Sequence, residues 1–224
     1  MGAAASLEEL AKAHAAGDGD IQFDAPENWR IDHARSLHKQ FKDGAYDFGV
    51  DRDTFDRLLA EGVPAAADAA GTFWRKFDTN DSLLINVLEL LSGVAVMSMG
   101  TVEEKIEFLF GVNDFNGTGS LSYDELVVLL YVCAAGTVLA SGKGVLPEEH
   151  AMEAIADEAF VECDLDISGR IDRPAFTLWI LDYMGITEET PTVGLREFLK
   201  RMKSLKHVKT SGAPPGAVVV ASSP

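Results

Sequence analysis

The sequence predicts an all-α protein with two lobes, each holding a pair of helix-loop-helix units whose loops are joined by a short two-stranded β ribbon. Two observations lead to this prediction: a twelve-residue polar loop lies between apolar helical patterns, and three weaker copies of it occur elsewhere in the chain. The 224 residues, 47% of them hydrophobic, suffice for a sizeable core in one large domain or two small ones.

The best-formed loop runs from Asp114 to Glu125 and matches the EF-hand pattern, which places an oxygen at each position that Ca²⁺ needs. Gly119 falls where the chain must turn through a left-handed conformation. An ordinary polar turn is the alternative, since Asn, Gly and Ser are common turn residues, but it does not account for the match at every ligand position. The predicted ligands are Asp114, Asn116, Thr118, the backbone carbonyl of Ser120, Ser122 and the bidentate Glu125.

The repeats organise the rest of the chain, because EF-hands pair through the apolar residue at the eighth loop position. These residues are Val50, Ile85, Leu121 and Ile171. We expect the first to pair with the second and the third with the fourth, which divides the chain into lobes at residues 25–99 and 100–187. The longer last interval predicts a flexible insert near residues 135–146.

The second loop, Asp78 to Glu89, is ambiguous. It places Leu83 where glycine is wanted, and a left-handed leucine is strained. Either the loop distorts or its affinity for Ca²⁺ falls. Its candidate ligands are Asp78, Asn80, Ser82, the carbonyl of Leu84, Asn86 and Glu89.

The fourth loop has Gly169 in the turn but ends in Ala175, so it lacks the bidentate carboxylate that moves the exiting helix. We expect weak binding of Ca²⁺ or Mg²⁺ without opening. Its candidate ligands are Asp164, Asp166, Ser168, the carbonyl of Arg170 and Asp172.

The first loop, Asp43 to Thr54, departs further from the pattern. It has Ala45 at a ligand position and Phe48 at the glycine position, and it ends without glutamate. We expect it to hold no metal and to be retained for packing.

Helix starts are marked by caps and prolines. Thr101 with Glu104 forms a capping box before the complete loop, and the next helix begins near Tyr123. An earlier helix is expected to be capped by Asp24 with Glu27 and to run through Trp29, Leu37 and Phe41. Prolines at first-turn positions mark three more helices, at Pro64, Pro147 and Pro174.

Charge and composition exclude several functions. The 19 basic and 36 acidic residues give a net charge of −17, which argues against nucleic acid as a partner and against spontaneous adsorption to anionic lipid. Cys133 and Cys163 lie in apolar helical patterns, which is typical of structural thiols in a reducing compartment such as the cytoplasm. The five histidines have no metal-ligand or triad spacing and no glycine-rich phosphate loop occurs, so no catalytic residue is predicted and we do not expect an enzyme.

The N-terminal segment, residues 1–24, has two interpretations. Gly2 with Ser6 fits the N-myristoylation pattern, whereas Ser6 with Glu9 equally fits the cap of an alanine-rich helix. One acyl chain binds membranes only marginally, and no second anchor is evident. Membrane contact is therefore expected to be weak and to require acylation of Gly2.

The C-terminal part differs from the acidic body. Residues 188–209 contain a basic amphipathic helix, with apolar residues at helical spacing from Leu195 to Leu205. This helix either folds back to cover an acidic lobe or is an ordinary packing helix with a solvated charged face. Residues 210–224 have the composition of a disordered tail.

A family resemblance rests on two stretches. From Phe77 the chain reads F-D-T-N-D-S-L-L-I-N-V-L-E-L-L-S-G-V, then T-V-E-E-K-I-E-F-L-F and the complete loop, while Gly49 to Phe55 reads G-V-D-R-D-T-F. Residues 25–185 thereby resemble the neuronal calcium sensor and calcineurin-B group, and within it calaxin-type sensors of motile cilia. The resemblance implies a four-EF-hand sensor with a degenerate first loop that binds a helix of a partner, an outer dynein arm component in calaxin. The departures at Leu83 and Ala175 indicate one strong metal site.

The sequence thus predicts a Ca²⁺ sensor that acts as a regulatory or adaptor subunit in the cytoplasm or the ciliary axoneme. Ion binding would draw Glu125 inward, rotate the following helix and open an apolar groove for an amphipathic partner helix. The alternatives are a constitutive structural subunit that resembles a light chain within an axonemal dynein assembly, and a Ca²⁺ buffer. The predicted groove residues are Ile106, Phe110, Leu126, Leu130, Phe160 and Trp179.

Overall fold

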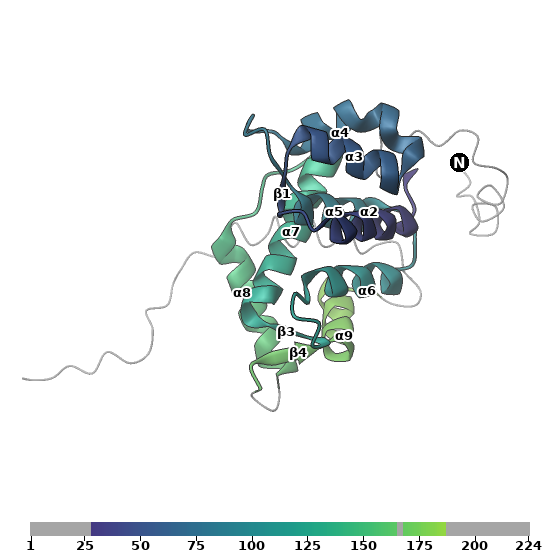
Figure 1. Ribbon diagram of the computed structural model, residues 1–224. Helices are drawn as coiled ribbons and strands as arrows, with labels where there is room; N and C mark the ends of the chain where they lie inside the picture. The colour runs from purple at the N-terminus through teal and green to yellow at the C-terminus, as the bar shows by residue number, and fades with distance from the viewer. Residues whose placement is uncertain (1–27, 165–167, 187–224) are drawn as a thin grey trace, which may run out of the picture.

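The computed structural model describes residues 28–164 and 168–186, and it confirms the predicted all-α fold with two short ribbons (Figure 1). The segments predicted at 1–24, 188–209 and 210–224, together with Asp166, lie outside the described residues. The elements, in chain order, are α2 (Ile31–Gly44), β1 (Gly49–Val50), α3 (Arg52–Gly62), the 3-10 helix η2 (Pro64–Ala69), α4 (Ala70–Phe77), β2 (Ile85–Asn86), α5 (Val87–Met97), α6 (Val102–Asn113), β3 (Ser120–Ser122), α7 (Tyr123–Ser141), α8 (Glu149–Cys163), β4 (Arg170–Asp172) and α9 (Arg173–Met184).

The two ribbons pair the loops as the repeats predicted. Strand β1 runs antiparallel to β2 with Val50 opposite Ile85, and β3 runs antiparallel to β4 with Leu121 opposite Ile171. All four side chains are buried, because each ribbon lies over the helices of its own pair of units. Each helix-loop-helix unit is thus bound to its neighbour through its loop.

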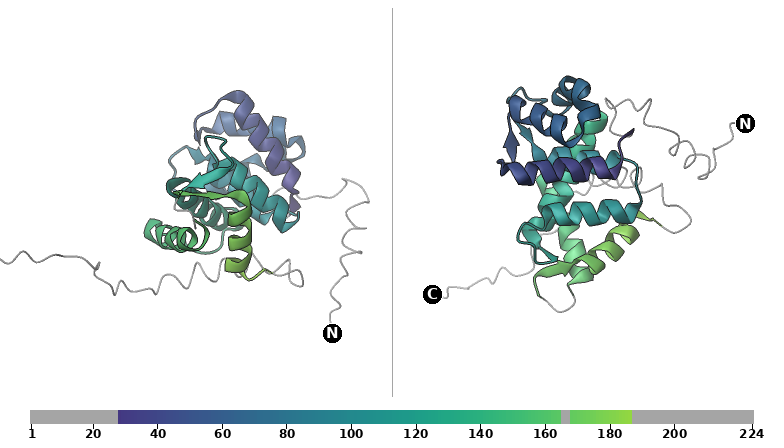
Figure 2. Two further views of the ribbon diagram at one scale, coloured as in Figure 1. Left: turned by 90° about the horizontal axis from the view of Figure 1, so that it is seen from below. Right: turned by 45° about the vertical axis from the view of Figure 1, so that its right-hand side comes forward.

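Helix α7 connects the two halves of the molecule. In Figures 1 and 2 it passes from the ribbon of β3 and β4 toward the first two units, where it contacts α4 and α5. The crossing with α5 is close: a Cβ on Gly93 would collide with the backbone carbonyl of Gly136. One continuous hydrophobic cluster extends from Trp29 to Tyr183, so the two pairs of units share a core.

The length of α7 corrects one prediction. The expected flexible insert at 135–146 is wrong as far as Ser141, because Ala135 and Ala140 lie fully buried in α7. Of the described helices, α7 alone is long and apolar enough to cross a membrane, but most of it is buried within the protein. It packs as a core helix.

The helix starts follow the caps and prolines with two exceptions, at Trp29 and at Pro147. Thr101 and Glu104 form the predicted capping box at α6, where the Thr101 N–H donates to the Glu104 carboxylate at 2.8 Å. Trp29, however, lies before α2 instead of within it. Its carbonyl accepts a hydrogen bond from the Met99 N–H at 2.6 Å, so this segment pairs with the chain that follows α5. Pro64 and Pro174 lie in the first turns of η2 and α9 as predicted, whereas Pro147 lies before Glu148, the N-cap of α8, and not in its first turn.

Candidate metal centre

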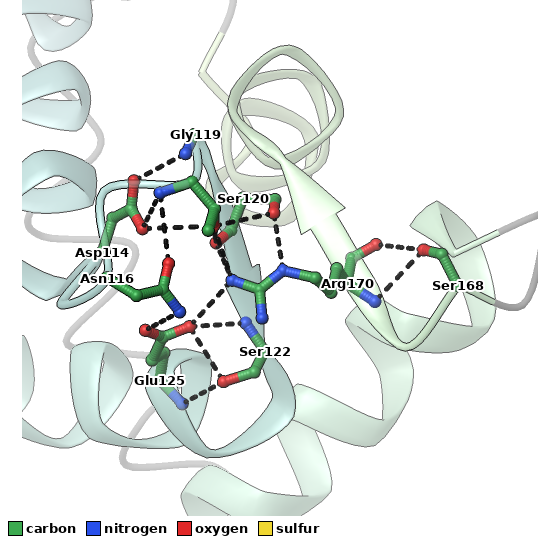
Figure 3. Close-up of polar contacts among 9 residues, drawn as sticks. Asp114, Asn116, Gly119, Ser120, Ser122, Glu125, Ser168 and Arg170 are labelled. Atoms are coloured by element: carbon green, nitrogen blue, oxygen red, sulfur yellow. Dashed lines mark hydrogen bonds and ion pairs between the residues drawn. The ribbon is translucent and has the colours of Figure 1, made fainter.

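The third loop, between α6 and α7, closes around the carboxylate of Asp114. One oxygen, Oδ1, accepts the N–H of Thr118 at 3.0 Å, and the other, Oδ2, accepts the N–H of Gly119 at 2.8 Å (Figure 3). Gly119 has a φ of 75°, the left-handed conformation expected at the sixth position. The turn therefore holds Asp114 at the head of the loop.

The other predicted ligands gather on the same side of this turn. The Thr118 hydroxyl donates to the Ser120 carbonyl at 3.1 Å, and the Asn116 amide donates to Glu125 Oε1 at 3.4 Å. The structure thus brings together the oxygen-bearing groups of loop positions one, three, five, seven and twelve. Ser122 caps α7 and hydrogen-bonds Glu125 directly.

Glu125 is held inside the loop in its ionised form. Only 7% of the residue is exposed, and burial by itself would raise the pKa of its carboxyl. The Ser122 N–H and hydroxyl, at 2.8 and 2.9 Å, and the guanidinium of Arg170, at 3.3 Å, outweigh burial and hold the pKa below its ordinary value. A charged carboxylate at this position is what a metal-binding loop requires.

The donor set fits a hard cation. Within the described residues no three His, Cys, Asp or Glu side chains cluster as a metal site, and the carboxylates that accept hydrogen bonds within the third loop are those of Asp114 and Glu125. Its remaining oxygens come from amide, hydroxyl and carbonyl groups. Such oxygen ligands suit Ca²⁺ or Mg²⁺ and are a poor match for Zn²⁺, which prefers nitrogen and sulfur.

The second loop keeps the EF-hand turn despite its leucine. Leu83 adopts a left-handed φ of 62°, and the Asp78 carboxylate accepts the N–H groups of Ser82 and Leu83 at 2.8 and 3.3 Å, as in the third loop. The final ligand differs. In the described part of the chain no hydrogen bond joins Glu89 to its loop, and burial raises the pKa of its carboxyl. Burial, and to a lesser degree the charge of Glu89, raise the pKa of Tyr131 in α7. The other candidates of this loop remain predictions.

The fourth loop repeats the hydrogen bonds of the turn but has no side-chain ligand at its last position. The Asp164 carboxylate accepts the N–H groups of Ser168 and Gly169 at 2.7 and 2.8 Å, and the Ser168 hydroxyl donates to the Arg170 carbonyl at 3.0 Å. Asp172 caps α9 through the Ala175 N–H at 2.8 Å. Because Ala175 offers no side-chain oxygen, the loop lacks the ligand that Glu125 supplies in the third loop.

The first loop has a different geometry. Its left-handed residue is Ala45, with a φ of 49°, and not Phe48. Asp43 forms an ion pair with Lys39 at 2.6 Å, and Asp51 caps α3 through the Thr54 N–H at 2.9 Å. Two of its carboxylates thus serve helix α2 and helix α3; that this loop holds no metal stays a prediction.

One functional side chain was missed by sequence reasoning. Arg170 was considered only for its backbone carbonyl in the fourth loop, yet its guanidinium reaches the third loop (Figure 3). The signal was present in the ribbon register: when eighth positions pair, position seven of one loop lies opposite position nine of the other. Arg170 accordingly lies opposite Ser122.

The paired helix-loop-helix units, the two ribbons and the loop geometry are the arrangement of an EF-hand fold. Comparison with known proteins supports this class. Calaxin from Xenopus laevis is 37% identical over 83 residues, which cover 37% of this chain and 40% of that protein. The calcium-binding protein NCSA from Dictyostelium discoideum is 28% identical over 118 residues, covering 51% and 63%.

The calcineurin-B protein from Yarrowia lipolytica matches over a longer span, at 26% identity over 170 residues, covering 75% of this chain and 88% of that protein. No family model matches the chain. The chain spans less than two thirds of the calaxin and NCSA relatives. These relatives are EF-hand calcium sensors, so the resemblance to the neuronal calcium sensor and calcineurin-B group is confirmed.

Proposed function

We propose that this protein is a Ca²⁺ sensor that acts as a regulatory or adaptor subunit and is not an enzyme. The observation that carries the proposal is the third loop, which gathers Asp114, Asn116, Thr118, the Ser120 carbonyl and the ionised Glu125 around one turn. The calcium-binding relatives support Ca²⁺ as the ion. Loops of this kind bind Ca²⁺ in the sensor range of about 0.1–10 μM. The second and fourth loops are proposed as weaker sites for Ca²⁺ or Mg²⁺.

Helix α7 is proposed to couple Ca²⁺ binding to movement within the protein. Glu125 is both a proposed ligand and a residue of the first turn of α7, so a shift of its carboxylate displaces that helix. Helix α7 contacts α4, α5, α6 and α8, and it therefore transmits the shift to both halves of the molecule. The predicted groove residues Ile106, Phe110, Leu126, Leu130 and Trp179 are buried in this structure, and Phe160 is partly buried.

The partner is proposed to be a protein that presents an amphipathic helix to this groove. The calcineurin-B relatives are by name subunits of a larger protein, which supports a regulatory role. On the resemblance to calaxin we propose a cytoplasmic protein of the cilium or flagellum with an axonemal dynein component as partner. The net charge of −17 argues against nucleic acid, and membrane contact is limited to the case in which Gly2 is myristoylated.

A constitutive structural subunit is the second candidate, and one observation favours it. The close crossing of Gly93 with Gly136 holds α7 against α5 and so resists a displacement of α7, although the predicted groove residues themselves lie on α6 to α9. Such a subunit would remain closed when Ca²⁺ binds. A buffer would bind Ca²⁺ and likewise remain closed, but it would need no partner.

Calorimetric titration of the wild type and of Glu125→Gln with Ca²⁺ tests the proposal. The wild type should bind one Ca²⁺ tightly, and Glu125→Gln should weaken that site about tenfold or more, because it removes the charged bidentate ligand. Glu107→Gln removes the same charge from an exposed position on α6 and should leave the affinity unchanged.

A hydrophobic dye measured in the same titration separates the candidate functions. The sensor predicts a rise in dye fluorescence on Ca²⁺ saturation of the wild type and of Glu107→Gln. An unchanged signal with tight binding would point to the structural subunit or the buffer, and a pull-down of partners with and without Ca²⁺ decides between those two. Absence of Ca²⁺ uptake by the wild type at micromolar free ion would refute the calcium function.

A further inference from the structure

The side chain and the main chain of Arg170 belong to different loops. Its carbonyl accepts the Ser168 hydroxyl at 3.0 Å within the fourth loop. Its guanidinium crosses the β3–β4 ribbon and donates from Nε to the Ser120 hydroxyl at 2.6 Å and from Nη2 to the Thr118 hydroxyl at 2.8 Å. One residue is therefore built into two neighbouring loops.

The guanidinium contacts the oxygens that the third loop offers to a cation. Besides Thr118, the same Nη2 donates to the backbone carbonyl of Ser120 and to Glu125 Oε2, the latter at 3.3 Å (Figure 3). These oxygens belong to the fifth, seventh and twelfth loop positions, which are ligand positions in an EF-hand. A positive charge already lies where three of the proposed ligands converge.

The contact is specific to this arginine. Arg173, three residues further on, forms an exposed ion pair with Glu107 at 3.0 Å and has no hydrogen bond to the third loop in the described structure. The Arg170 side chain is 32% exposed and the Glu125 side chain only 9%, so water screens their interaction incompletely. The planar fork of a guanidinium can contact several oxygens at once, which a lysine ammonium cannot do in the same geometry.

We propose that Arg170 is a tethered competitor of Ca²⁺ at the third loop, so that its guanidinium must leave Thr118, Ser120 and Glu125 before the ion binds. This inference rests on the proposed calcium function and adds the regulation of that site. Arg170 stabilises the ion-free loop, lowers its affinity for Ca²⁺ and sets a higher threshold for the sensor. Since a divalent cation repels the guanidinium, each excludes the other.

The same residue couples the two loops. When the guanidinium is displaced, the Arg170 backbone and its carbonyl, a candidate ligand of the fourth loop, lose one of the restraints on their position. The affinity of the fourth loop thus depends on whether the third loop is loaded, and by thermodynamic linkage the reverse also holds.

Calorimetric titration with CaCl₂ of the full chain tests the competition. Arg170→Gln removes the charge but keeps the backbone carbonyl of the fourth loop, and it should raise the Ca²⁺ affinity of the third loop about tenfold. Arg170→Lys, which keeps the charge without the fork, should give an intermediate affinity. Arg173→Gln makes the same change in net charge nearby and should leave the affinity within about twofold of the wild type.

Thermal unfolding in EGTA and in excess Ca²⁺ provides a readout that a purely structural arginine would not produce. Arg170→Gln should be less stable than the wild type in EGTA, yet gain more stability from Ca²⁺, because it has no internal cation to displace. A purely structural role predicts lower stability in both conditions and no gain in affinity.

Equal or lower Ca²⁺ affinity in Arg170→Gln would overturn the competition and leave the calcium function standing. A gain of similar size in Arg173→Gln would also overturn it, because the effect would then be one of net charge. If neither the wild type nor Arg170→Gln takes up Ca²⁺, while both remain folded, the calcium function and this inference fail together.

Discussion

At the scale of single residues, Leu83 shows a conflict between local preference and the loop pattern. Its φ of 62° is one that residues with a Cβ rarely adopt, and the residue is 69% exposed, so little burial compensates for the strain. The turn persists because the Asp78 carboxylate holds the N–H groups of Ser82 and Leu83. The strain is therefore sustained by the hydrogen bonds of the loop.

Leu83→Gly should relieve that strain. The left-handed leucine costs about 1–2 kcal/mol, and glycine loses about 0.5–1 kcal/mol more conformational entropy on folding, so we expect the free energy of unfolding to rise by about 0.5–1 kcal/mol. Urea denaturation in EGTA measures this change. The matched control is Leu84→Gly at an exposed neighbour with a negative φ, which should lower stability by about 0.5–1 kcal/mol. A loss of stability in Leu83→Gly as large as in the control would contradict the strain.

At the scale of elements, the crossing of α5 and α7 depends on two glycines. A Cβ on Gly93 would collide with the Gly136 carbonyl, and a Cβ on Gly136 would collide with the Glu89 carbonyl. In both cases the obstacle is backbone, which cannot move aside as the end of a flexible side chain can. Close contact between the two helices therefore requires glycine at both positions.

Gly93→Ala and Gly136→Ala should each destabilise the fold by about 1–3 kcal/mol or more, the range of overpacked core substitutions. Gly111→Ala on α6 is the control, because a Cβ there meets nothing within 4 Å. It should stabilise by about 0.5–1 kcal/mol through helix propensity alone. All three substitutions share that propensity gain, so the differences in urea midpoint isolate the crossing. Three equal midpoints would show that α5 and α7 can separate without loss.

The elements also show how far sequence patterns reach. Pairing of Val50 with Ile85 and of Leu121 with Ile171 was predictable, because the loop repeat fixes the register of each ribbon. The full length of α7 was not, since the longer last repeat interval suggested an insert where the run around Gly136 in fact continues the helix and packs on α5. The contact of the Arg170 guanidinium with the third loop depends on the direction of its side chain across the ribbon, and the sequence pattern of a single loop does not contain that direction.

At the scale of the whole molecule, one contact between the two halves involves a titratable side chain, that of His38. His38 of α2 packs edge-on against Phe108 of α6, with ring centroids 5.7 Å apart. Burial, and to a lesser degree the charge of Lys42, lower the pKa of His38 below its ordinary value. The folded protein thus favours the neutral imidazole at the boundary between the first and third units.

This contact should make stability depend on pH. The unfolded chain protonates His38 near its ordinary pKa of about 6.5, whereas the folded chain resists protonation, so the contribution is present above that pH and is lost as the pH falls toward the folded pKa. His38→Gln cannot take up this proton. Its free energy of unfolding relative to the wild type should therefore rise as the pH falls from 7.5 to 5.5. Urea denaturation in EGTA at both pH values measures the change. The control is His150→Gln, at a side chain that is 71% exposed, whose free energy of unfolding should follow that of the wild type at both pH values. A difference between His38→Gln and the wild type that is constant with pH would contradict the role of His38 in the pH dependence.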